Sequence, residues 1–312
     1  MNATADLALS HWPVAVQSCE LAAHRENAVY RVTAVDGSEY ALRLHRPGYR
    51  SPQELQSELL WMAELARQGL RVPEPLTTKT GSHIVLVDGI HVDLLTWLPG
   101  DPLGKSGTPL VLPDAPATFF QIGRETARLH QLSDKWQKPH GFVRHAWDHN
   151  GLIGANPVWG PFWENPGLTK NDLKIMAAAR TKANAELAQL AGTLDYGLIH
   201  ADLLRENILL EGECVHLIDF DDGGHGFRLF ELATTLLRNR SEPEYAELQQ
   251  QLITGYQSVR PLDTSRLPMF MALRAFTYVG WIIPRMHEPG KQSRNARIIA
   301  EAVELANIYL ES

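Results

Sequence analysis

Three oxygen-bearing side chains near the middle of the chain have the types and spacing that phosphoryl transfer requires. Asp202 lies two residues after His200, Asn207 follows five positions later, and Asp219 ends a later apolar run. Phosphoryl transfer needs one carboxylate to orient or deprotonate the attacking hydroxyl, and further oxygens to hold the Mg²⁺ ion that bridges the nucleotide phosphates. Mg²⁺ is a hard cation that prefers oxygen ligands. The pattern therefore predicts Asp202 as the catalytic residue, with Asn207 and Asp219 as metal ligands.

The segment around these side chains reads as strand, tight loop, strand, turn, strand, acidic loop and helix. Short apolar runs bounded by turn residues, here 208–210 and 215–218, are typical of strands. A hairpin of these strands would bring Asn207 and Asp219 near each other on adjacent strands, with Asp202 on the loop above them. An ordinary hairpin with a solvated acidic loop is the alternative, and the conjunction of H-x-D-x-x-x-x-N with D-F-D argues against it.

These two motifs resemble the catalytic and metal-binding loops of the aminoglycoside phosphotransferase family. This branch of the protein-kinase-like fold also contains choline kinases, type II homoserine kinases, hydroxylysine kinases and stress response kinase A. Protein kinases carry a similar H-R-D loop followed by D-F-G. Here Ala201 replaces the Arg and Asp221 replaces the Gly, and both changes favour the branch that acts on small molecules.

The resemblance implies an α+β, protein-kinase-like fold of two lobes. Residues 1–98 would form a nucleotide-binding lobe with a small antiparallel sheet and one helix. Residues 99–312 would form a mostly helical lobe that carries the catalytic hairpin and the acceptor site. The hinge between the lobes is expected at about residues 96–100, where the chain reads T-W-L-P-G.

Arg43 is the residue expected to position the phosphates, because it stands where kinases keep the Lys of V-A-I-K. An Arg is always charged and can fork onto phosphate oxygens, although a strand Arg that faces solvent is the alternative. Glu58, on the following helix, is expected to pair with Arg43, since Glu54 is already needed for a capping box with Ser51. The alternative for Glu58 is a solvated position on the helix surface.

Other nucleotide contacts follow from the same resemblance. Asn27 ends the segment His24-Arg25-Glu26-Asn27, which has no glycine-rich loop; its side chain is expected either to approach a phosphate or to form a plain strand-entry turn. The backbone from Thr96 to Leu98 would offer hydrogen bonds to the nucleotide base. The segment that begins at Gly100, G-D-P-L-G-K-S, is one residue too short for a P-loop and is discarded.

The remaining elements are predicted from periodicity and turn residues. Asp36-Gly37 and Asp88-Gly89 predict two hairpins. Apolar spacing predicts a helix that Ser51 caps and Gly69 ends, followed by further helices in the second lobe. The predicted strands are 28–35, 39–44, 82–87 and 91–97, and the further helices are about 115–132, 171–190, 231–237, 244–259, 267–283 and 293–309.

The acceptor site has weaker candidates. Residues 141–163 form a long loop rich in Trp, and such loops are usually functional or disordered; Trp147 and Arg144 would either wall the acceptor or brace the catalytic loop. Trp281 and Arg285 would line the acceptor from the far side, or simply pack at a helix end. Asp222, with its neighbour in the acidic loop, would add a metal ligand or attract a cationic acceptor.

Composition excludes several classes of protein. The net charge of -7 argues against a nucleic-acid partner, because binding to the phosphate backbone needs a basic face. The two cysteines, Cys19 and Cys214, are too few for a disulfide framework. The start of the chain lacks the pattern of a signal peptide, and the apolar run from Met269 to Ile283 contains Arg274 and is shorter than the roughly 20 residues of a membrane span. We therefore expect a cytoplasmic protein with no membrane partner.

The hypothesis is a kinase that depends on ATP or GTP and Mg²⁺ and phosphorylates a hydroxyl of a small molecule. By analogy with homoserine and hydroxylysine kinases, the acceptor would be a hydroxy amino acid or an amino alcohol, an argument from fold alone. A protein Ser/Thr kinase resembling stress response kinase A is one alternative, since it shares the D-F-D-D loop. A pseudokinase that binds nucleotide without catalysis is the other, and the intact Asp202, Asn207 and Asp219 argue against it.

Overall fold

The computed structural model describes residues 3–24, 27–190 and 192–312. The chain forms two compact units, and each is built from three separate segments. The first unit comprises Met1–Asp101, Lys135–Arg144 and Ile208–Asp221, and the second comprises Pro102–Asp134, His145–Asn207 and Asp222–Ser312. The sequence predicted a single division of the chain at residue 98. In the structure, the first unit extends to Asp101 and also includes two later segments.

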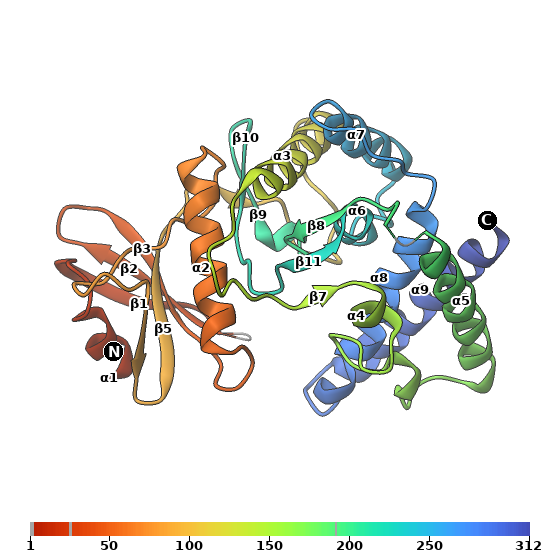
Figure 1. The fold of residues 1–312 in the computed structure, drawn as a ribbon, viewed down its shortest axis with the longest axis horizontal. Helices are drawn as coiled ribbons and strands as arrows, with labels where there is room; N and C mark the ends of the chain where they lie inside the picture. The colour runs from red at the N-terminus through yellow and green to blue at the C-terminus, as the bar shows by residue number, and fades with distance from the viewer. Residues whose placement is uncertain (1–2, 25–26, 191) are drawn as a thin grey trace. The chain divides into compact units, whose positions relative to one another are not determined.

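The first unit contains a five-stranded antiparallel sheet with strand order β1-β2-β3-β5-β4. Helix α2 lies along this sheet (Figure 1). The combination confirms the expected α+β fold with one main helix on a small sheet. The elements are α1 (Ala3–Leu9), β1 (Val16–His24), β2 (Ala28–Ala34), β3 (Glu39–Leu44), α2 (Pro52–Arg67), β4 (Ile84–Val87) and β5 (Ile90–Thr96).

Local sequence signals account for much of this unit. Ser51 and Glu54 form the predicted capping box at the start of α2, with the Glu54 carboxylate accepting from the Ser51 N–H at 3.0 Å. Asp88 and Gly89 both adopt positive φ, 51° and 77°, as a tight two-residue hairpin turn requires. Strand β1 was not predicted, because its residues are largely exposed and show no alternation of apolar and polar residues.

The predicted catalytic hairpin is present. Strands β9 (Ile208–Glu211) and β10 (Cys214–Leu217) pair antiparallel, and Leu217 lies opposite Ile208. The short strand β6 (Asp101–Pro102) joins β9 on its other side. Gly100, just before β6, has φ 100°, and a Cβ there would lie 2.6 Å from the Leu210 carbonyl oxygen. This position next to the hairpin therefore requires glycine.

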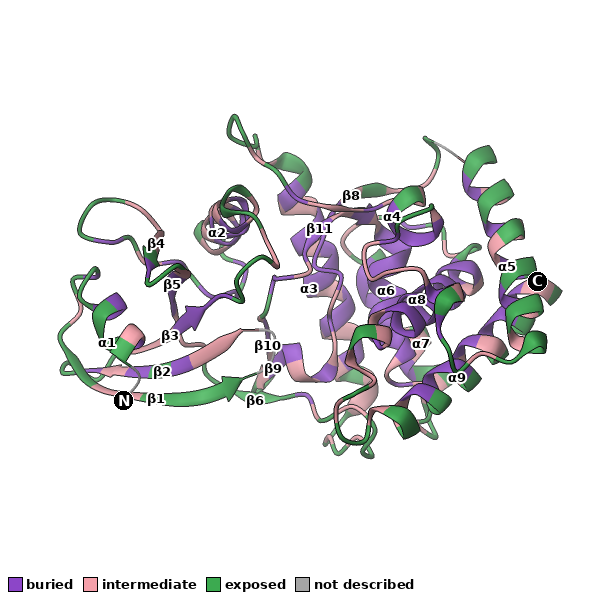
Figure 2. Cartoon of the chain, turned by 90° about the horizontal axis from the view of Figure 1, so that it is seen from below, coloured by how far each residue is buried: buried purple, intermediate pink, exposed green. Residues whose placement is uncertain are grey.

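The second unit is mostly helical, as expected. Figure 2 shows that α6 and α8 are almost wholly buried, whereas α5 and α9 expose one face. The sequence suggested a loop without regular structure at residues 141–163. The structure instead has β7, α4 and a 3-10 turn in this segment. The elements are α3 (Ala115–Lys135), β7 (Ala146–Trp147), α4 (His149–Ile153), η1 (Phe162–Glu164), α5 (Lys170–Gln189), β8 (Tyr196–Ile199), η2 (Arg205–Asn207), β11 (Gly224–Phe227), α6 (Arg228–Leu237), α7 (Tyr245–Gln257), α8 (Leu267–Trp281), η3 (Ile283–Arg285) and α9 (Lys291–Glu311).

Helix α8 with the 3-10 turn after it is long and apolar enough to pass a test for a membrane span. The 19-residue segment Leu267–Arg285 has a mean hydropathy of 1.3, but 78% of this window is buried inside the protein. The apolar side chains of α8 are thus already covered, and the helix serves as a core element of the second unit.

Candidate active site

Glu231 of α6 organises the turn that carries Asp202. The backbone N–H groups of His200 and Ala201 donate to the two oxygens of the Glu231 carboxylate, the second at 2.9 Å. Ala201 adopts φ 64°, in the left-handed region that non-glycine residues rarely visit. Burial raises the pKa of Glu231 to about 7, and the N–H groups of His200 and Ala201 oppose this rise. The turn after β8 is therefore fixed by a buried carboxylate.

Asp202 and Asn207 lie together, as the sequence predicted. The Asn207 Nδ2 atom donates to the Asp202 backbone oxygen at 2.9 Å and to Asp202 Oδ2 at 3.1 Å. The other carboxylate oxygen, Oδ1, accepts from Arg274 Nη2 of α8 at 2.9 Å. Burial raises the pKa of Asp202 to about 6, while Arg274 acts to lower it and Asp222 to raise it further. The orientation of the carboxylate is thus set from both sides.

The buried Arg205 anchors the other end of the same loop. Its Nε donates to Asn239 Oδ1 at 2.8 Å, and its Nη1 donates to the Thr108 carbonyl at 2.7 Å. Its Nη2 donates to Glu242 Oε1 at 2.5 Å. The segment from Asp202 to Asn207 is therefore held at both ends by side chains of α6 and of the residues that follow it.

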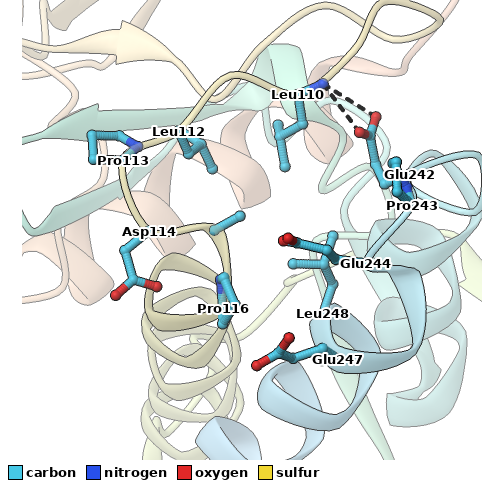
Figure 3. Close-up of a pocket in the computed structure, with 11 residues that line it drawn as sticks. Leu110, Leu112, Pro113, Asp114, Pro116, Glu242, Pro243, Glu244, Glu247 and Leu248 are labelled. Carbon is cyan, nitrogen blue, oxygen red and sulfur yellow. Dashed lines mark hydrogen bonds between the residues drawn. The ribbon is translucent and has the colours of Figure 1, made fainter.

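A pocket of about 460 Å³ opens beside this anchor, between the starts of α3 and α7 (Figure 3). Glu242 forms one wall, where both of its oxygens accept from the Leu110 N–H at 3.2 Å. The other acidic side chains of the lining are Asp114, Glu244 and Glu247. None of the side chains predicted to take part in catalysis lines this pocket.

In the first unit, four buried charged residues form a network that we call the Arg43 cluster: Arg43, Glu58, Asp93 and Arg144. Arg43 makes the predicted ion pair with Glu58, from Nη1 to Oε1 at 2.8 Å. It also forks onto Asp93, from Nε and Nη2 to the two carboxylate oxygens at 2.8 Å each. Burial alone would raise the pKa of Asp93, but Arg43 and His45 hold it well below its usual range. Two carboxylates thus compensate the charge of Arg43.

Arg144 ties α2 to the loop that carries Asp219. Its Nη1 donates to Glu58 Oε2 at 3.2 Å, and its Nη2 donates to the carbonyl oxygens of Phe220 and Asp221 at 3.0 and 2.7 Å. These contacts favour a bracing role for Arg144 over the acceptor contact considered from the sequence. Asp219 adopts φ 68° in this loop, two residues after β10, and its role as a metal ligand stays a prediction.

Asn27 contacts the same acidic loop that Arg144 binds. Its Nδ2 donates to Asp221 Oδ2 at 2.7 Å, and its Oδ1 accepts from the Arg46 N–H at 3.1 Å. The side chain therefore joins the start of β2 to the acidic loop. Arg25 and Glu26, which complete the polar turn noted in the sequence, lie outside the described residues.

Part of the backbone from Thr96 to Leu98, predicted to contact the nucleotide base, already makes hydrogen bonds within the protein. The Thr96 N–H donates to the Glu74 carbonyl at 2.9 Å, and the Trp97 N–H donates to the Glu39 carbonyl at 3.0 Å. Within the residues that the structure describes, the Leu98 N–H has no recorded partner. Leu98 is therefore the better donor candidate, whereas Thr96 retains only its carbonyl oxygen for this role.

Two of the acceptor-site candidates have distinct surroundings. The Trp147 indole is fully buried, stacks on Phe230 with ring centroids 5.3 Å apart, and donates from Nε1 to the Asp222 carbonyl at 2.8 Å. These contacts favour the bracing interpretation of Trp147. Trp281 is only half-buried, and the Arg285 guanidinium lies over its ring at 4.3 Å.

Three residues of these networks, one in the first unit and two in the second, were not assigned a role from the sequence: Asp93, Glu231 and Arg274. Each stands as the lone charged residue within a run of apolar and small residues, as in V-D-L-L, F-E-L-A and A-L-R-A. A charge in the interior is costly unless it is paired. A lone charge inside a buried strand or helix is therefore the signal that could have found them.

The donor atoms suit a magnesium nucleotide. In the part of the chain that the structure describes, no three His, Cys, Asp or Glu side chains cluster as a metal site by themselves. A kinase metal ion, however, draws ligands from the phosphates as well as from Asp and Asn. Because the Asn207 nitrogen is committed to Asp202, its Oδ1 is the atom left for a cation, and hard oxygen donors are what Mg²⁺ prefers.

Comparison with known proteins agrees with this chemistry. A profile of the phosphotransferase enzyme family matches residues 18–262, more than half of the chain. Homoserine kinase of Acidiphilium cryptum (strain JF-5) is 24% identical over 271 residues, which cover 84% of this chain and 78% of that kinase.

Two solved structures share the fold. A microcompartment-associated aminopropanol kinase matches with a TM-score of 0.85 and 29% identity, covering 98% of this chain and 97% of that one. The amicoumacin kinase hAmiN, solved with AMP-PNP, Ca²⁺ and Ami, matches with a TM-score of 0.77 and 20% identity, covering 96% and 92%. The chain belongs to the phosphotransferase enzyme family and is a kinase with an alcohol group as acceptor.

Proposed function

We propose that this kinase transfers the γ-phosphoryl group of ATP or GTP to the hydroxyl of a hydroxy amino acid or an amino alcohol, with Mg²⁺ as the metal. The observation that carries the proposal is the turn that Glu231 fixes, which presents Asp202 with Asn207 bonded to it. The names of the relatives support the acceptor class, because they include a homoserine kinase and an aminopropanol kinase.

Each predicted residue takes one role in this reaction. Asp202 orients the acceptor hydroxyl and receives its proton, and Arg274 fixes the carboxylate for that task. Asn207 and Asp219 would hold the metal ion, which when bound neutralises charge on the phosphates. Arg43 with Glu58 would support the phosphate site through the buried network that both form with Asp93, and the Leu98 backbone would contact the base.

The proposed partners are small molecules. A net charge of -7 argues against a nucleic-acid partner, because binding to the phosphate backbone needs a basic face. We place the reaction in the cytoplasm, where both nucleotide donors are available.

The test is transfer of labelled phosphate from ATP and from GTP to a panel of amino acids, amino alcohols, sugars and aminoglycosides. We expect Asp202→Asn to lower transfer by about 10²- to 10⁴-fold, because a positioned general base contributes that much, while binding of the Mg²⁺ nucleotide persists. Glu213→Gln, at an exposed position of the hairpin turn, is the matched control. Full activity in Asp202→Asn, or no transfer by the native protein to any acceptor, would refute the proposal.

A further inference from the structure

Three arginines of the second unit lie over aromatic rings, and one of them, Arg274, donates to Asp202. We call the three the Asp202 arginines: Arg238, Arg274 and Arg294. Arg238 directly follows α6, Arg274 lies on α8, and Arg294 lies on α9. Each guanidinium group lies over an aromatic ring. Arg238 lies over the Tyr278 ring at 3.7 Å, and Arg274 lies over the same ring at 4.4 Å. Arg294 lies over Trp281 at 5.0 Å.

The rings themselves form a continuous support for these cations. Trp159 lies 5.4 Å from Tyr278 and 6.3 Å from Trp281, measured between ring centroids. Arg274 lies over Trp159 at 4.5 Å and donates to Asp202. Trp159 thus contacts the rings beneath Arg238 and Arg294 and also packs against Arg274, which donates to Asp202.

The protein satisfies the donors of the Asp202 arginines only in part: among the described residues, Arg274 pairs with Asp202 through Nη2, but its Nε and Nη1 atoms are buried with no hydrogen-bond partner. The carboxylate paired with Arg238 is Glu301, at 3.8 Å, and the Arg238 Nη2 atom is buried with no hydrogen-bond partner among the described residues. Arg294 makes no ion pair with any carboxylate in that part of the chain. Burial and the charge of Arg238 lower the pKa of Arg294, whereas Tyr278 and Glu206 act to raise it. Burial alone would lower the pKa of Arg238, but Tyr278 and Glu301 outweigh the effect of burial and raise this pKa.

Buried guanidinium donors without hydrogen-bond partners lower protein stability unless a negatively charged group binds to them. Burial of an unpaired charge or of an unsatisfied donor destabilises a protein, and stacking on an aromatic ring recovers only part of that loss. An anion between Arg238 and Arg294 would satisfy both guanidinium groups. Guanidinium groups bind carboxylate and phosphate oxygens with two parallel hydrogen bonds.

We propose that the acceptor carries an anionic group, a carboxylate, and that Arg238 and Arg294 bind it while Asp202 receives the hydroxyl proton. This inference rests on the proposed function and divides its two acceptor classes: a hydroxy amino acid has the carboxylate, and an amino alcohol lacks it. Asp222, whose charge acts on Asp202, remains suited to the ammonium group of the same acceptor. Arg274 is a positioning residue, because its Nη2 is bonded to Asp202 and Tyr278.

Two pairs of acceptors test the proposal, because the members of each pair differ only in one carboxylate. L-threonine is compared with 1-amino-2-propanol, and L-homoserine with 3-amino-1-propanol. For the pair that the native enzyme phosphorylates, we expect kcat/KM to be about tenfold or more higher for the amino acid, as charge-assisted hydrogen bonds imply. An equal or higher kcat/KM for the amino alcohol overturns the proposal.

Substitutions assign the effect to the two arginines. Arg294→Gln and Arg238→Gln should raise KM for the amino acid by about 10- to 100-fold, with kcat nearly unchanged. The kcat/KM for the matching amino alcohol should not move. Arg297→Gln, one turn further along α9 at an exposed position, is the control and should behave like the native enzyme. A loss that is equal for both members of a pair contradicts the assignment.

A binding measurement separates this proposal from the proposed function. L-2-aminobutyrate has the carboxylate but no hydroxyl, and 1-aminopropane has neither, so calorimetry reports the anion site without turnover. We expect the native protein to bind L-2-aminobutyrate more tightly than 1-aminopropane, and Arg294→Gln to lose this difference. That result without phosphate transfer to any acceptor would keep the anion site and refute the kinase acceptor class; transfer without that difference would refute the anion site alone.

Discussion

The Arg43 cluster of the first unit and the Asp202 arginines of the second unit are built from the same kinds of side chain but differ in charge balance. In the Arg43 cluster, two guanidinium groups meet two carboxylates through contacts of 2.8 to 3.2 Å. Among the Asp202 arginines, Arg274 meets Asp202 at 2.9 Å and Arg238 meets Glu301 at 3.8 Å, while Arg294 has no ion pair within the described residues.

This difference in charge balance suggests different roles. The Arg43 cluster stabilises the fold of the first unit, whereas the Asp202 arginines are suited to bind an anionic ligand. A balanced buried network needs no external charge, and removing one member leaves its partner buried and unpaired. An unbalanced one gains most when a ligand of opposite charge binds. Substitution in the Arg43 cluster should therefore lower protein stability, whereas substitution of Arg238 or Arg294 should lower acceptor binding.

The largest expected effect on stability is that of Asp93→Asn. The substitution keeps the shape of the side chain but removes the charge that Arg43 and His45 both contact. We expect the free energy of unfolding to fall by about 3–5 kcal/mol, the usual result of breaking a buried ion pair on one side. Urea unfolding measures this change.

Glu20→Gln provides the control for Asp93→Asn. Glu20 lies on β1 of the same sheet and is exposed, so its substitution should change the free energy of unfolding by less than about 0.5 kcal/mol. If Asp93→Asn were as mild as this control, the Arg43 cluster would not be the balanced network described above.

A smaller effect, with a defined pH dependence, is expected for Glu231. The folded protein raises the pKa of this carboxyl from 4.5 to about 7, so between these values the folded state holds a proton that the unfolded state releases. The free energy of unfolding contributed by Glu231 is therefore present below pH 4.5 and is lost as pH rises toward 7. The loss is on the order of 3 kcal/mol, since one pKa unit corresponds to about 1.4 kcal/mol.

The test compares wild type with Glu231→Gln, because Gln cannot titrate at this position. The difference in urea unfolding free energy, wild type minus variant, should fall between about pH 5 and about pH 7.5. Other titrating groups, such as Glu301, are present in both proteins and cancel. A difference that does not depend on pH would contradict this expectation and show that the N–H groups of His200 and Ala201 offset the burial of Glu231.

Local signals explain which parts of this fold could be predicted from the sequence. The capping box of Ser51 and Glu54 and the Asp88-Gly89 turn depend on residues that are neighbours in the chain, and all are present in the structure. The pairing of Arg43 with Glu58 was predicted from the resemblance, which supplied the layout of strand and helix.

Residues brought together by strand register or helix packing could not be predicted in the same way. Asp93 meets Arg43 because β3 and β5 pair in a register that places these residues opposite each other, and nothing local fixes that register. Arg274 and Asp202 are 72 residues apart in the chain. The excess of positive charge around Asp202 became visible only when α6, α8 and α9 were placed together, which is why the acidic loop alone suggested a cationic acceptor.

Asn27→Ala should give the smallest effect and tests how far the balance of the first unit extends. Both polar atoms of this side chain are engaged, with Asp221 and with the Arg46 N–H, at a position that is only half-buried. We expect the free energy of unfolding to fall by about 1–1.5 kcal/mol, and the Kd for the Mg²⁺ nucleotide to change by less than about threefold. Gln53→Ala, at an exposed position of α2, is the control. A rise in Kd of about tenfold or more would show that Asn27 contacts a phosphate, and the first unit would then share the dependence on an external anion that distinguishes the Asp202 arginines.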